Sequence, residues 1–533
     1  MAVSSLRLTR SLSWPQLALW LAPALLLPIY YEVLAWRAAG TLGFPLDDAW
    51  IHAQFARNLA TGHGFTYTGG RWVAGSTSPA WTILLAFGYL VTRSALVAGK
   101  CLGVALQLVC GLIAARLVFA LTGHRALATA GAAIVVATPA MVWGAVSGME
   151  IGLTCALVLG GFYLYLTAVE QPRRQIAGVA LLAVACLARP ETLVLFGLTA
   201  LHFVAGSRSP RAFARRAASA IVIALLVFGP FVLFDYLTIG RPLPTTFYAK
   251  SGPGLLRVVP EGNRELTRRL FFTHGPDAVR KFWDTLLDQY GIAAILPLAG
   301  FAAAFTRTLR RKGAALVALS ILAACFAMGL IEPMRLKPEN FRYTAQLVCL
   351  AAVLGIAALS MVRPLLGRPV ALGAVLAAIV AVACYHSVQS ARVYAGSVKN
   401  IEQLHVTLAD WMRSHLPPGT TVAVNDIGAL AYFSGHEIID LEGLVSPEAL
   451  AQPRTGRGLG VAQETKPDYV AIFPGWYPDI SGRPDLFHEV YRVTITDNYV
   501  SAGDVLIVYS TPWTRYPPIP GPVRNEKRRR WPA

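Results

Sequence analysis

The sequence predicts a polytopic α-helical membrane protein with a C-terminal soluble α/β domain. The chain of 533 residues is 55% hydrophobic and only 14% charged, with a mean hydropathy of +0.51, values that soluble proteins of this size rarely reach. Apolar runs long enough to cross a hydrocarbon core of about 30 Å recur between Trp14 and His386, whereas the sequence after Val398 has an ordinary soluble composition. The chain therefore divides into a membrane region (residues 1–397), an exterior domain (398–510) and a basic, proline-rich tail (511–533).

The apolar runs predict about eleven membrane crossings, together with interfacial or re-entrant helices. The first, from Trp14 to about Trp36, follows two arginines and carries no small-residue cleavage site, so we expect an uncleaved signal anchor. The other crossings are expected near residues 100–121, 126–146, 151–169, 175–188, 192–206, 217–238, 291–306, 313–331, 341–362 and 369–388. Because 175–188 and 192–206 are short, Arg189-Pro190-Glu191 is expected at membrane depth, facing protein or water.

The arginine and lysine clusters predict the orientation. If the apolar segment 79–97 is a re-entrant or interfacial helix, the clusters at residues 208–216 and 307–312 lie on the cytoplasmic side, as the positive-inside tendency favours. The first exterior loop (37–78), the loop 239–290 and the C-terminal domain are then extracytoplasmic. The tail residues Lys527–Arg530 are expected to touch anionic head groups.

Composition also argues against several classes of function. The net charge of +18 comes from short basic clusters between apolar runs, without an interleaved basic and aromatic face, so no nucleic-acid partner is expected. All seven cysteines fall inside apolar segments and none forms a Cys-x-x-Cys pair, which indicates neither a disulfide framework nor a zinc site. No cofactor is expected, although a pair of aspartates described below leaves a divalent ion as an alternative.

The exterior domain is expected to begin with a helix over 398–416. Strands are predicted at residues 421–424, 437–441, 469–473 and 505–509. Asp426, Asp440 and Glu442 stand at strand ends, where turns favour acidic residues, so structural roles are expected for them. Trp476 and Tyr477 in a loop suggest a surface that faces carbohydrate.

The most informative segment follows the first crossing. Asp47 and Asp48 open a stretch in which Ile51, Phe55 and Leu59 recur at four-residue spacing, which predicts an amphipathic helix at the membrane interface. One aspartate would suffice as an N-cap. Two adjacent carboxylates in a chain poor in acids also fit a site in which one accepts a proton and the other orients a group. A second helix is expected from Ser78-Pro79.

Here the sequence resembles the bacterial polyprenyl-phosphate-dependent glycosyltransferases of the C-type membrane fold (GT-C), especially the mycobacterial terminal arabinofuranosyltransferase family. The motifs that carry the resemblance are Asp47-Asp48-Ala49-Trp50, Arg57-Asn58-Leu59, Gly62-His63-Gly64, Gly75-Ser76-Thr77 and Pro79-Ala80-Trp81-Thr82. Weaker matches are Ser147-Gly148-Met149-Glu150, Ala188-Arg189-Pro190-Glu191, Pro244–Lys250, Phe341-Arg342-Tyr343 and Asn425–Ala429. Members commonly carry a Glu-Gly-Tyr-Thr-Asn turn where this chain has Ala74–Ser78, so the resemblance leaves the sugar open.

The resemblance implies a multi-pass protein of the bacterial plasma (inner) membrane that moves a sugar from a polyprenyl-phosphate donor to a carbohydrate, lipid or protein acceptor outside the cell. It implies Asp47 as the base that takes the acceptor proton, and Asp48 as its partner or as a ligand of the acceptor sugar. The cations expected at the donor phosphate are Lys250, Arg342 and Arg189. Further substrate contacts are expected from His63, Tyr248, Tyr343, Glu150 and Glu191.

Several of these residues also have a structural interpretation. Arg189 could pair with Glu191, Arg342 could anchor the chain at the interface, and Glu150 could cap its helix. Lys250 could be solvated, and His63 could belong only to its turn. Two other functions stay open as well. A lipid or sugar transporter or flippase would show internal repeats, which are absent from the sequence, and a non-catalytic envelope assembly protein would tolerate loss of both aspartates.

Overall fold

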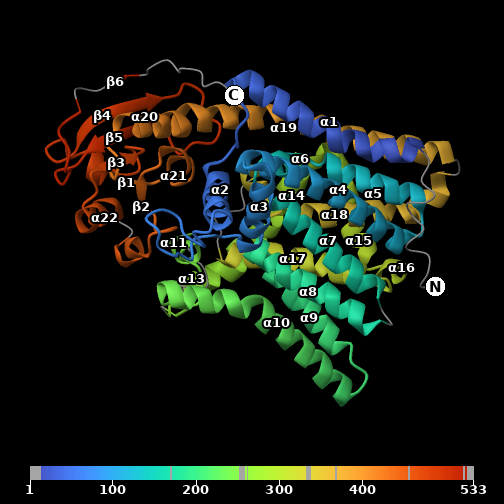
Figure 1. Ribbon diagram of the computed structural model, residues 1–533. Coiled ribbons are helices and arrows are strands. Elements are labelled where there is room, and N and C mark those ends of the chain that lie inside the picture. Colours follow the sequence, from blue (N-terminus) through green and yellow to red (C-terminus); the bar gives the residue numbers. More distant parts are fainter. Residues whose placement is uncertain are drawn as a thin grey trace.

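The computed structural model describes residues 14–168, 171–250, 259–260, 262–331, 338–366, 369–453, 456–519 and 523–524. It consists of a body of helices with a sheet domain at one end (Figure 1). The long helices α1 (Trp14–Ala39) and α19 (Pro369–Ile401) pack side by side along the body. α19 continues through a π-helical turn, η8 (Glu402–Val406), into α20 (Thr407–His415) of the sheet domain. The predicted boundary at 397/398 therefore lies inside one continuous helical rod.

The helical body is built from elements of very different lengths. The first half contains α2 (Asp47–Ala60), α3 (Pro79–Thr92), α4 (Ala95–Thr122), α5 (Arg125–Ala137), α6 (Pro139–Val146), α7 (Ile151–Thr167), α8 (Pro172–Ala188), η3 (Pro190–Thr192), α9 (Leu193–Ala205) and α10 (Pro210–Ile239). The second half contains α11 (Thr245–Lys250), α13 (Arg264–Arg269), η4 (Leu270–His274), α14 (Gly275–Tyr290), η5 (Gly291–Ala294), α15 (Ile295–Ala304), α16 (Arg307–Arg310), α17 (Ala314–Ile331), η6 (Pro338–Tyr343), α18 (Ala345–Val362) and η7 (Arg363–Leu366).

Six helical stretches among the described residues are long and apolar enough to cross a membrane, or seven if a bent pair is one crossing. The bent pair is α5 and α6, which meet at an angle of 56°. The crossing predicted at 126–146 therefore corresponds to a bent pair of helices. The bend has a local cause, because Pro139 lacks an amide hydrogen and disfavours helical geometry at Thr138. The figure of about eleven crossings stays a prediction, because α3, α7 and α9 are apolar but shorter than a span of typical length.

The region expected as a long exterior loop, residues 239–290, contains several helices. α13, η4 and α14 follow one another from Arg264 to Tyr290 and lead through η5 into α15. α15 has ten residues, about 15 Å at 1.5 Å per residue, so the predicted crossing at 291–306 is not one helix of spanning length. Only when Arg264–Ala304 is taken as one continuous helical stretch is it long and apolar enough to cross a membrane.

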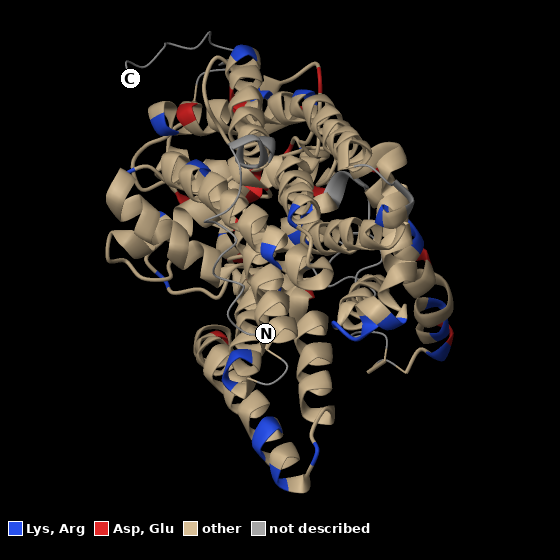
Figure 2. Ribbon diagram, turned by 90° about the vertical axis from the view of Figure 1, so that its right-hand side faces the viewer, with Lys and Arg blue, Asp and Glu red and all other residues tan. Residues whose placement is uncertain are grey.

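The break predicted between 175–188 and 192–206 is confirmed. α8 ends at Ala188, Arg189 is extended, and the short η3 leads into α9. Arg189 is buried in protein, as expected for a charge at this position. The basic turn after α9 lies at the tip of the α9–α10 hairpin, and both this tip and α16 lie at the end of the body away from the sheet domain (Figures 1 and 2).

The sheet domain has six strands in the order β2-β1-β3-β5-β4-β6. They are β1 (Thr421–Val424), β2 (Glu437–Asp440), β3 (Tyr469–Ile472), β4 (His488–Thr494), β5 (Val505–Ser510) and β6 (Val523–Arg524). β1 pairs in parallel with β2 and β3, and β5 runs antiparallel to β3 and β4. The helical elements α21 (Gly428–Ser434), η9 (Pro447–Ala451), α22 (Arg457–Thr465) and α23 (Pro478–Ser481) connect the strands. The four predicted strands are confirmed; β4 and β6 are additional.

The first exterior loop is packed into the sheet domain and is not a free connection. Phe55 of α2, together with Tyr67 and Val73 after it, belongs to the same buried cluster as Leu404, Val424 and other core residues of the domain. A bridge between Thr66 and Trp72 orders the loop itself. α2 is thus fixed between the helical body and the sheet domain, and its first residues lie at their junction (Figure 1).

Candidate active site

Asp47 and Asp48 occupy the first turn of α2, and neither acts as its cap. The N-cap is Leu46, and no side chain caps the helix. Carboxylates in a first turn interact favourably with the partial positive charge of the helix N-terminus, which helps to explain where the helix begins. Both side chains reach instead to other elements. The N-cap interpretation is therefore wrong, and the two aspartates bind different partners.

Asp47 binds the start of α21 in the sheet domain. Its Oδ2 accepts a hydrogen bond from the amide of Gly428 and its Oδ1 one from the amide of Ala429, both at 2.7 Å. The two elements are so close that a Cβ on residue 428 would lie 2.0 Å from the Asp47 carbonyl oxygen, so only glycine fits there. Burial raises the pKa of Asp47 to about 6, opposed by the charge of His405 and the two amide bonds and reinforced by Asp426.

His405 and Asp426 form an ion pair beside Asp47. His405 lies in η8, and its side chain is buried. Its Nε2 is 2.7 Å from Asp426 Oδ2. Burial alone would lower the pKa of His405, but the hydrogen bond and charge of Asp426 and the charge of Asp47 raise it above its ordinary value. The expectation that Asp426 serves only its turn missed this contact. The expected structural role is confirmed for Asp440. Its carboxylate accepts hydrogen bonds from the amides of Glu442 and Val445 at 2.8 and 2.7 Å.

Asp48 leads into the helical body through Arg342. Arg342 Nη1 lies 2.9 Å from Asp48 Oδ2, and Nη2 donates to the hydroxyl of Tyr343 at 3.1 Å. The Arg189 guanidinium stacks over the Tyr343 ring, 4.5 Å from its centre. The structure thus brings together four predicted site residues, Asp48, Arg342, Tyr343 and Arg189, although they come from three distant parts of the sequence.

The carboxylates of Glu150 and Glu191 lie close to the Arg189 guanidinium. It forms an ion pair with Glu150, and its Nε lies 3.5 Å from Glu191 Oε2. His52 of α2 lies next to Glu150, with Nε2 3.4 Å from Oε2. Glu150 stands at the N-cap of α7 but its side chain does not cap the helix, so the capping interpretation of Glu150 is wrong. The internal ion pair left open for Arg189 and Glu191 is the arrangement that the structure shows.

Other predicted site residues lie apart from the aspartates. His63 is exposed in the turn after α2, with Nδ1 2.8 Å from the Thr61 hydroxyl, and α2 separates it from Asp47 by about 21 Å of helix. Tyr248 of α11 lies under the Arg241 guanidinium, at 4.9 Å. The Lys250 side chain and the tail Lys527–Arg530 lie outside the described residues.

The sheet domain differs from the prediction that both Trp476 and Tyr477 face carbohydrate. Trp476 is exposed, but Tyr477 is buried and donates a hydrogen bond to Glu442. Tyr477 is therefore a core residue of the domain. Within the described ranges, no group of three or more His, Cys, Asp or Glu side chains is placed to hold a metal ion.

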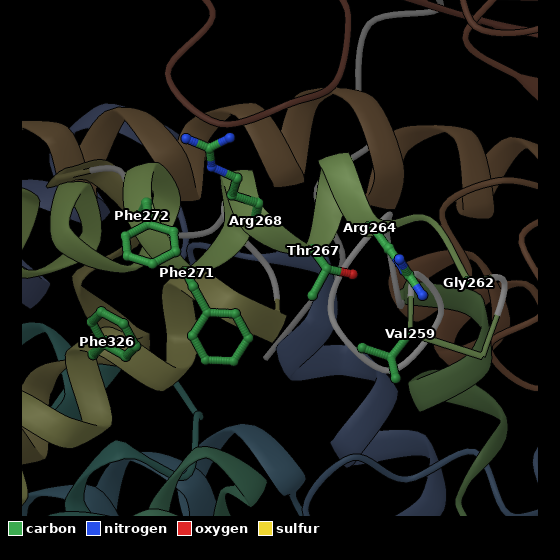
Figure 3. Close-up of a pocket in the computed structure, with 8 residues that line it drawn as sticks. All are labelled: Val259, Gly262, Arg264, Thr267, Arg268, Phe271, Phe272 and Phe326. Atoms are coloured by element: carbon green, nitrogen blue, oxygen red, sulfur yellow. The ribbon is translucent and has the colours of Figure 1, made fainter.

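A cavity of about 730 Å³ lies where α13 and η4 face α17. It is lined by Val259, Gly262, Arg264, Thr267, Arg268, Phe271, Phe272 and Phe326. Figure 3 shows the phenylalanine side chains at one end and Arg264 at the other. None of the aspartates lines it, so this space is distinct from the contacts of Asp47 and Asp48.

Comparisons with known proteins bear on the fold. Residues 398–516 match a family model described as "Domain of unknown function (DUF8728)". Comparison of the sequence with curated proteins finds no significant match. Among solved structures, ArnT from Cupriavidus metallidurans bound to undecaprenyl phosphate is similar with a TM-score of 0.58 and 12% identity, over 95% of this chain and 100% of that chain.

The similarity extends to a second group of proteins. The oligosaccharyltransferase of Archaeoglobus fulgidus, solved with zinc and sulfate, has a TM-score of 0.56 and 14% identity over 85% of this chain and 67% of that chain. The archaeal oligosaccharyltransferase AglB from the same organism, in complex with an inhibitory peptide and a dolichol-phosphate, has a TM-score of 0.53 and 14% identity over 86% and 69%. This protein is therefore a multi-pass membrane protein with the GT-C fold, as the sequence resemblance implied.

Proposed function

We propose that the protein is a membrane glycosyltransferase that moves a sugar from a polyprenyl-phosphate carrier to an acceptor on the outer face of a bacterial plasma membrane. The observation that carries this proposal is the divided aspartate pair at the start of α2, within a GT-C fold. Asp47 is held by two amides of the sheet domain, and Asp48 by Arg342 of the helical body. Two carboxylates in different environments can take different roles.

Asp47 is the proposed proton acceptor. The acceptor oxygen attacks the anomeric carbon of the donor sugar, the bond from that carbon to the phosphate oxygen breaks, and the lipid phosphate leaves with the electron pair. The proton of the attacking hydroxyl passes to Asp47. A pKa of about 6 leaves this carboxylate largely ionised at neutral pH while keeping it a better base than an ordinary aspartate. Each oxygen accepts one amide hydrogen bond, so lone pairs remain for the substrate.

The negative charge of the leaving phosphate needs fixed cations. Arg342 is the proposed contact, because a guanidinium has five N–H donors and only part of them are used by Asp48 and Tyr343. Lys250 remains a proposed second contact. Arg189 is compensated by Glu150 and Glu191, so we assign it the support of Tyr343 and, through that ring, of Arg342. Asp48 then positions Arg342 and the acceptor.

The cavity beside α13 suits the lipid portion of such a donor. Phenylalanine side chains give one end apolar surface next to Arg268, and Arg264 stands at the other end (Figure 3). An isoprenoid chain has the apolar chemistry that matches the aromatic surface, and one of the similar structures is bound to undecaprenyl phosphate. The acceptor class, carbohydrate, lipid or protein, stays open; the exposed Trp476 of the sheet domain is a proposed contact for it.

The distribution of basic residues supports the proposed orientation. The tip of the α9–α10 hairpin and α16 both carry arginine clusters, and both lie at the end of the body away from the sheet domain (Figures 1 and 2). Short basic loops favour the cytoplasmic side of a membrane. The sheet domain, Asp47 and Asp48 would then be extracytoplasmic, where polyprenyl-phosphate sugars meet envelope acceptors.

The proposal is tested by measuring sugar release and transfer from a panel of polyprenyl-phosphate sugars. The purified full chain is compared with Asp47→Asn, Asp48→Asn and a matched control, Asp410→Asn. The exposed Asp410 of α20 forms an ion pair with Arg413 of the same helix. We expect the wild type and the control to turn over a donor and both site variants to fall by at least about 10²-fold. A folded wild type that consumes none of the donors, or site variants as active as the control, would refute the proposal.

A further inference from the structure

The sheet domain reaches Asp47 through two separate segments. The connection from β1 to α21 supplies the amides of Gly428 and Ala429, at 2.7 Å from the carboxylate oxygens, and Asp426. The second segment, η8, supplies His405, whose Nε2 lies 2.7 Å from Asp426 Oδ2. Both segments belong to the range matched by the domain of unknown function.

The His405–Asp426 pair combines a buried histidine with a partly exposed carboxylate. The His405 side chain is 1% exposed, and Asp426 is 26% exposed. A second carboxylate, Asp47, acts on the same imidazole. Two neighbouring carboxylates repel each other, and each then holds a proton more tightly than it would alone; a cation shared between them relieves this repulsion. A protonated His405 therefore favours the ionised form of Asp47.

We propose that the sheet domain is part of the catalytic unit, with His405, held by Asp426, acting as a positioning residue that keeps the Asp47 carboxylate ionised and correctly placed. This inference rests on the proposed function, because that function makes Asp47 the proton acceptor. The domain thereby does more than present an acceptor. Its packing on α2 decides whether the base is charged, so a loosened domain gives a poorly active enzyme even when donor and acceptor are bound.

Other charged and titratable groups also face this cluster. Tyr67 donates its hydroxyl to the carbonyl of Ile427 at 2.8 Å, next to the Asp47 contact. Asp48 with Arg342 lies on the side of the helical body. Asp440 and Arg57 of α2 also act on Tyr67, and Glu402 of η8 is buried one turn before His405. All of them are kept in the variants below, so they form a constant background.

The first test compares pH–rate profiles of the full chain in lipid nanodiscs. His405→Gln removes the cation, so the acid limb of kcat is expected to move up by about one pH unit, with a fall of about tenfold on that limb and KM for the donor within about twofold. Asp426→Asn removes a repelling carboxylate together with the partner of the imidazolium, and the opposing effects should give a smaller shift.

His436→Gln is the matched control. His436 is a buried histidine of the same domain, and its Nε2 contacts only the Met412 carbonyl, at 3.1 Å, within the described structure. If a histidine has only a structural role, its substitution lowers the stability of the fold and leaves the acid limb of the kcat profile at the same pH. If His405→Gln lowers stability as His436→Gln does and leaves the limb in place, the inference is overturned.

A second measurement does not depend on activity. The histidine ring carbons of the full chain are labelled with ¹³C, and the His405 signal, assigned by its loss in His405→Gln, is titrated in the wild type and in Asp47→Asn. We expect the pKa of His405 to lie above its ordinary value of 6.5 in the wild type and to fall in Asp47→Asn. An unchanged titration overturns the coupling. If the titration changes but no polyprenyl-phosphate donor is consumed, the ion-pair arrangement stands and the catalytic assignment falls with the proposed function.

Discussion

Gly428→Ala perturbs the contact between α2 and the sheet domain by a single methyl group. The added Cβ would lie 2.0 Å from the carbonyl oxygen of Asp47 and 2.8 Å from its Cγ and Oδ2. Ordinary contact begins at 3.4 Å, so the start of α21 must move away by roughly 1.4 Å. A shift of that size would take both 2.7 Å amide bonds to Asp47 beyond hydrogen-bond range.

The expected cost follows from these distances. Overpacking of this kind costs about 1–3 kcal/mol, and each hydrogen bond to a charged group that is given up costs about 1.5–3 kcal/mol. Because both amide bonds to Asp47 are given up, we expect a loss of about 3–6 kcal/mol in the free energy of unfolding. Misplacement of a reacting group by about 1 Å can cost about 10²-fold in rate, and we expect kcat to fall by that order.

The assay pairs thermal unfolding of the full chain with the rate of sugar transfer. Gly475→Ala is the control, because a Cβ at that position of the same domain meets no atom within 4 Å. The control should match the wild type in both measurements. Wild-type stability and kcat in Gly428→Ala would show that α21 does not hold Asp47, and the proposed construction of the site would then be wrong.

Three further predictions concern the other charged contacts. Arg189→Met leaves the buried Glu150 without the arginine and should lower the free energy of unfolding by about 3–5 kcal/mol in thermal or denaturant melts. Adding Glu150→Gln should recover part of this loss. Additive losses in the double variant would contradict the pairing. Arg342→Lys keeps the charge but loses the planar fork, so kcat should fall by about 10²-fold at similar stability, whereas a wild-type rate would exclude Arg342 from the phosphate. Burial works to raise the pKa of Asp468, but hydrogen bonds from Arg515 and Thr421 lower it to about 2. The Asp468 carboxylate therefore stabilises the fold at pH values above its ordinary pKa of 3.8. This stabilisation disappears as the pH falls towards 2. The difference in melting temperature between wild type and Asp468→Asn should therefore shrink between pH 5 and pH 2 (about the two pKa values), and a constant difference would contradict that assignment.

Sequence patterns predicted the elements whose signals are local. The apolar runs, the four-residue spacing after Asp48 and the short runs rich in β-branched and aromatic residues at β1, β2, β3 and β5 correspond to elements of the structure. β4 was missed because its register shifts between Glu489 and Tyr491, which breaks the period of two by which a half-buried strand is detected. The kink between α5 and α6 did have a local signal, Pro139.

The site was only partly predictable, for a different physical reason. The aspartate pair stands out locally, but the partners of Asp47 are more than 350 residues away, at 405, 426, 428 and 429, and no periodicity announces such a contact. A weak signal was present in the Asn425–Ala429 motif, which contains both Asp426 and Gly428. Tyr477 shows the opposite error: in a loop it looks like a ligand contact, whereas tertiary packing against Gly458 buries it.

A single-turnover experiment tests the central claim most directly. Wild type and Asp47→Asn, each loaded with the same polyprenyl-phosphate sugar and with bound donor quantified, are mixed with acceptor, and the product is followed over one turnover. If Asp47 accepts the proton of the acceptor, both proteins bind donor equally and the variant transfers the sugar at least about 10²-fold more slowly, with the deficit independent of donor concentration. Equal single-turnover rates for the two loaded proteins would contradict the assignment of Asp47 as the base.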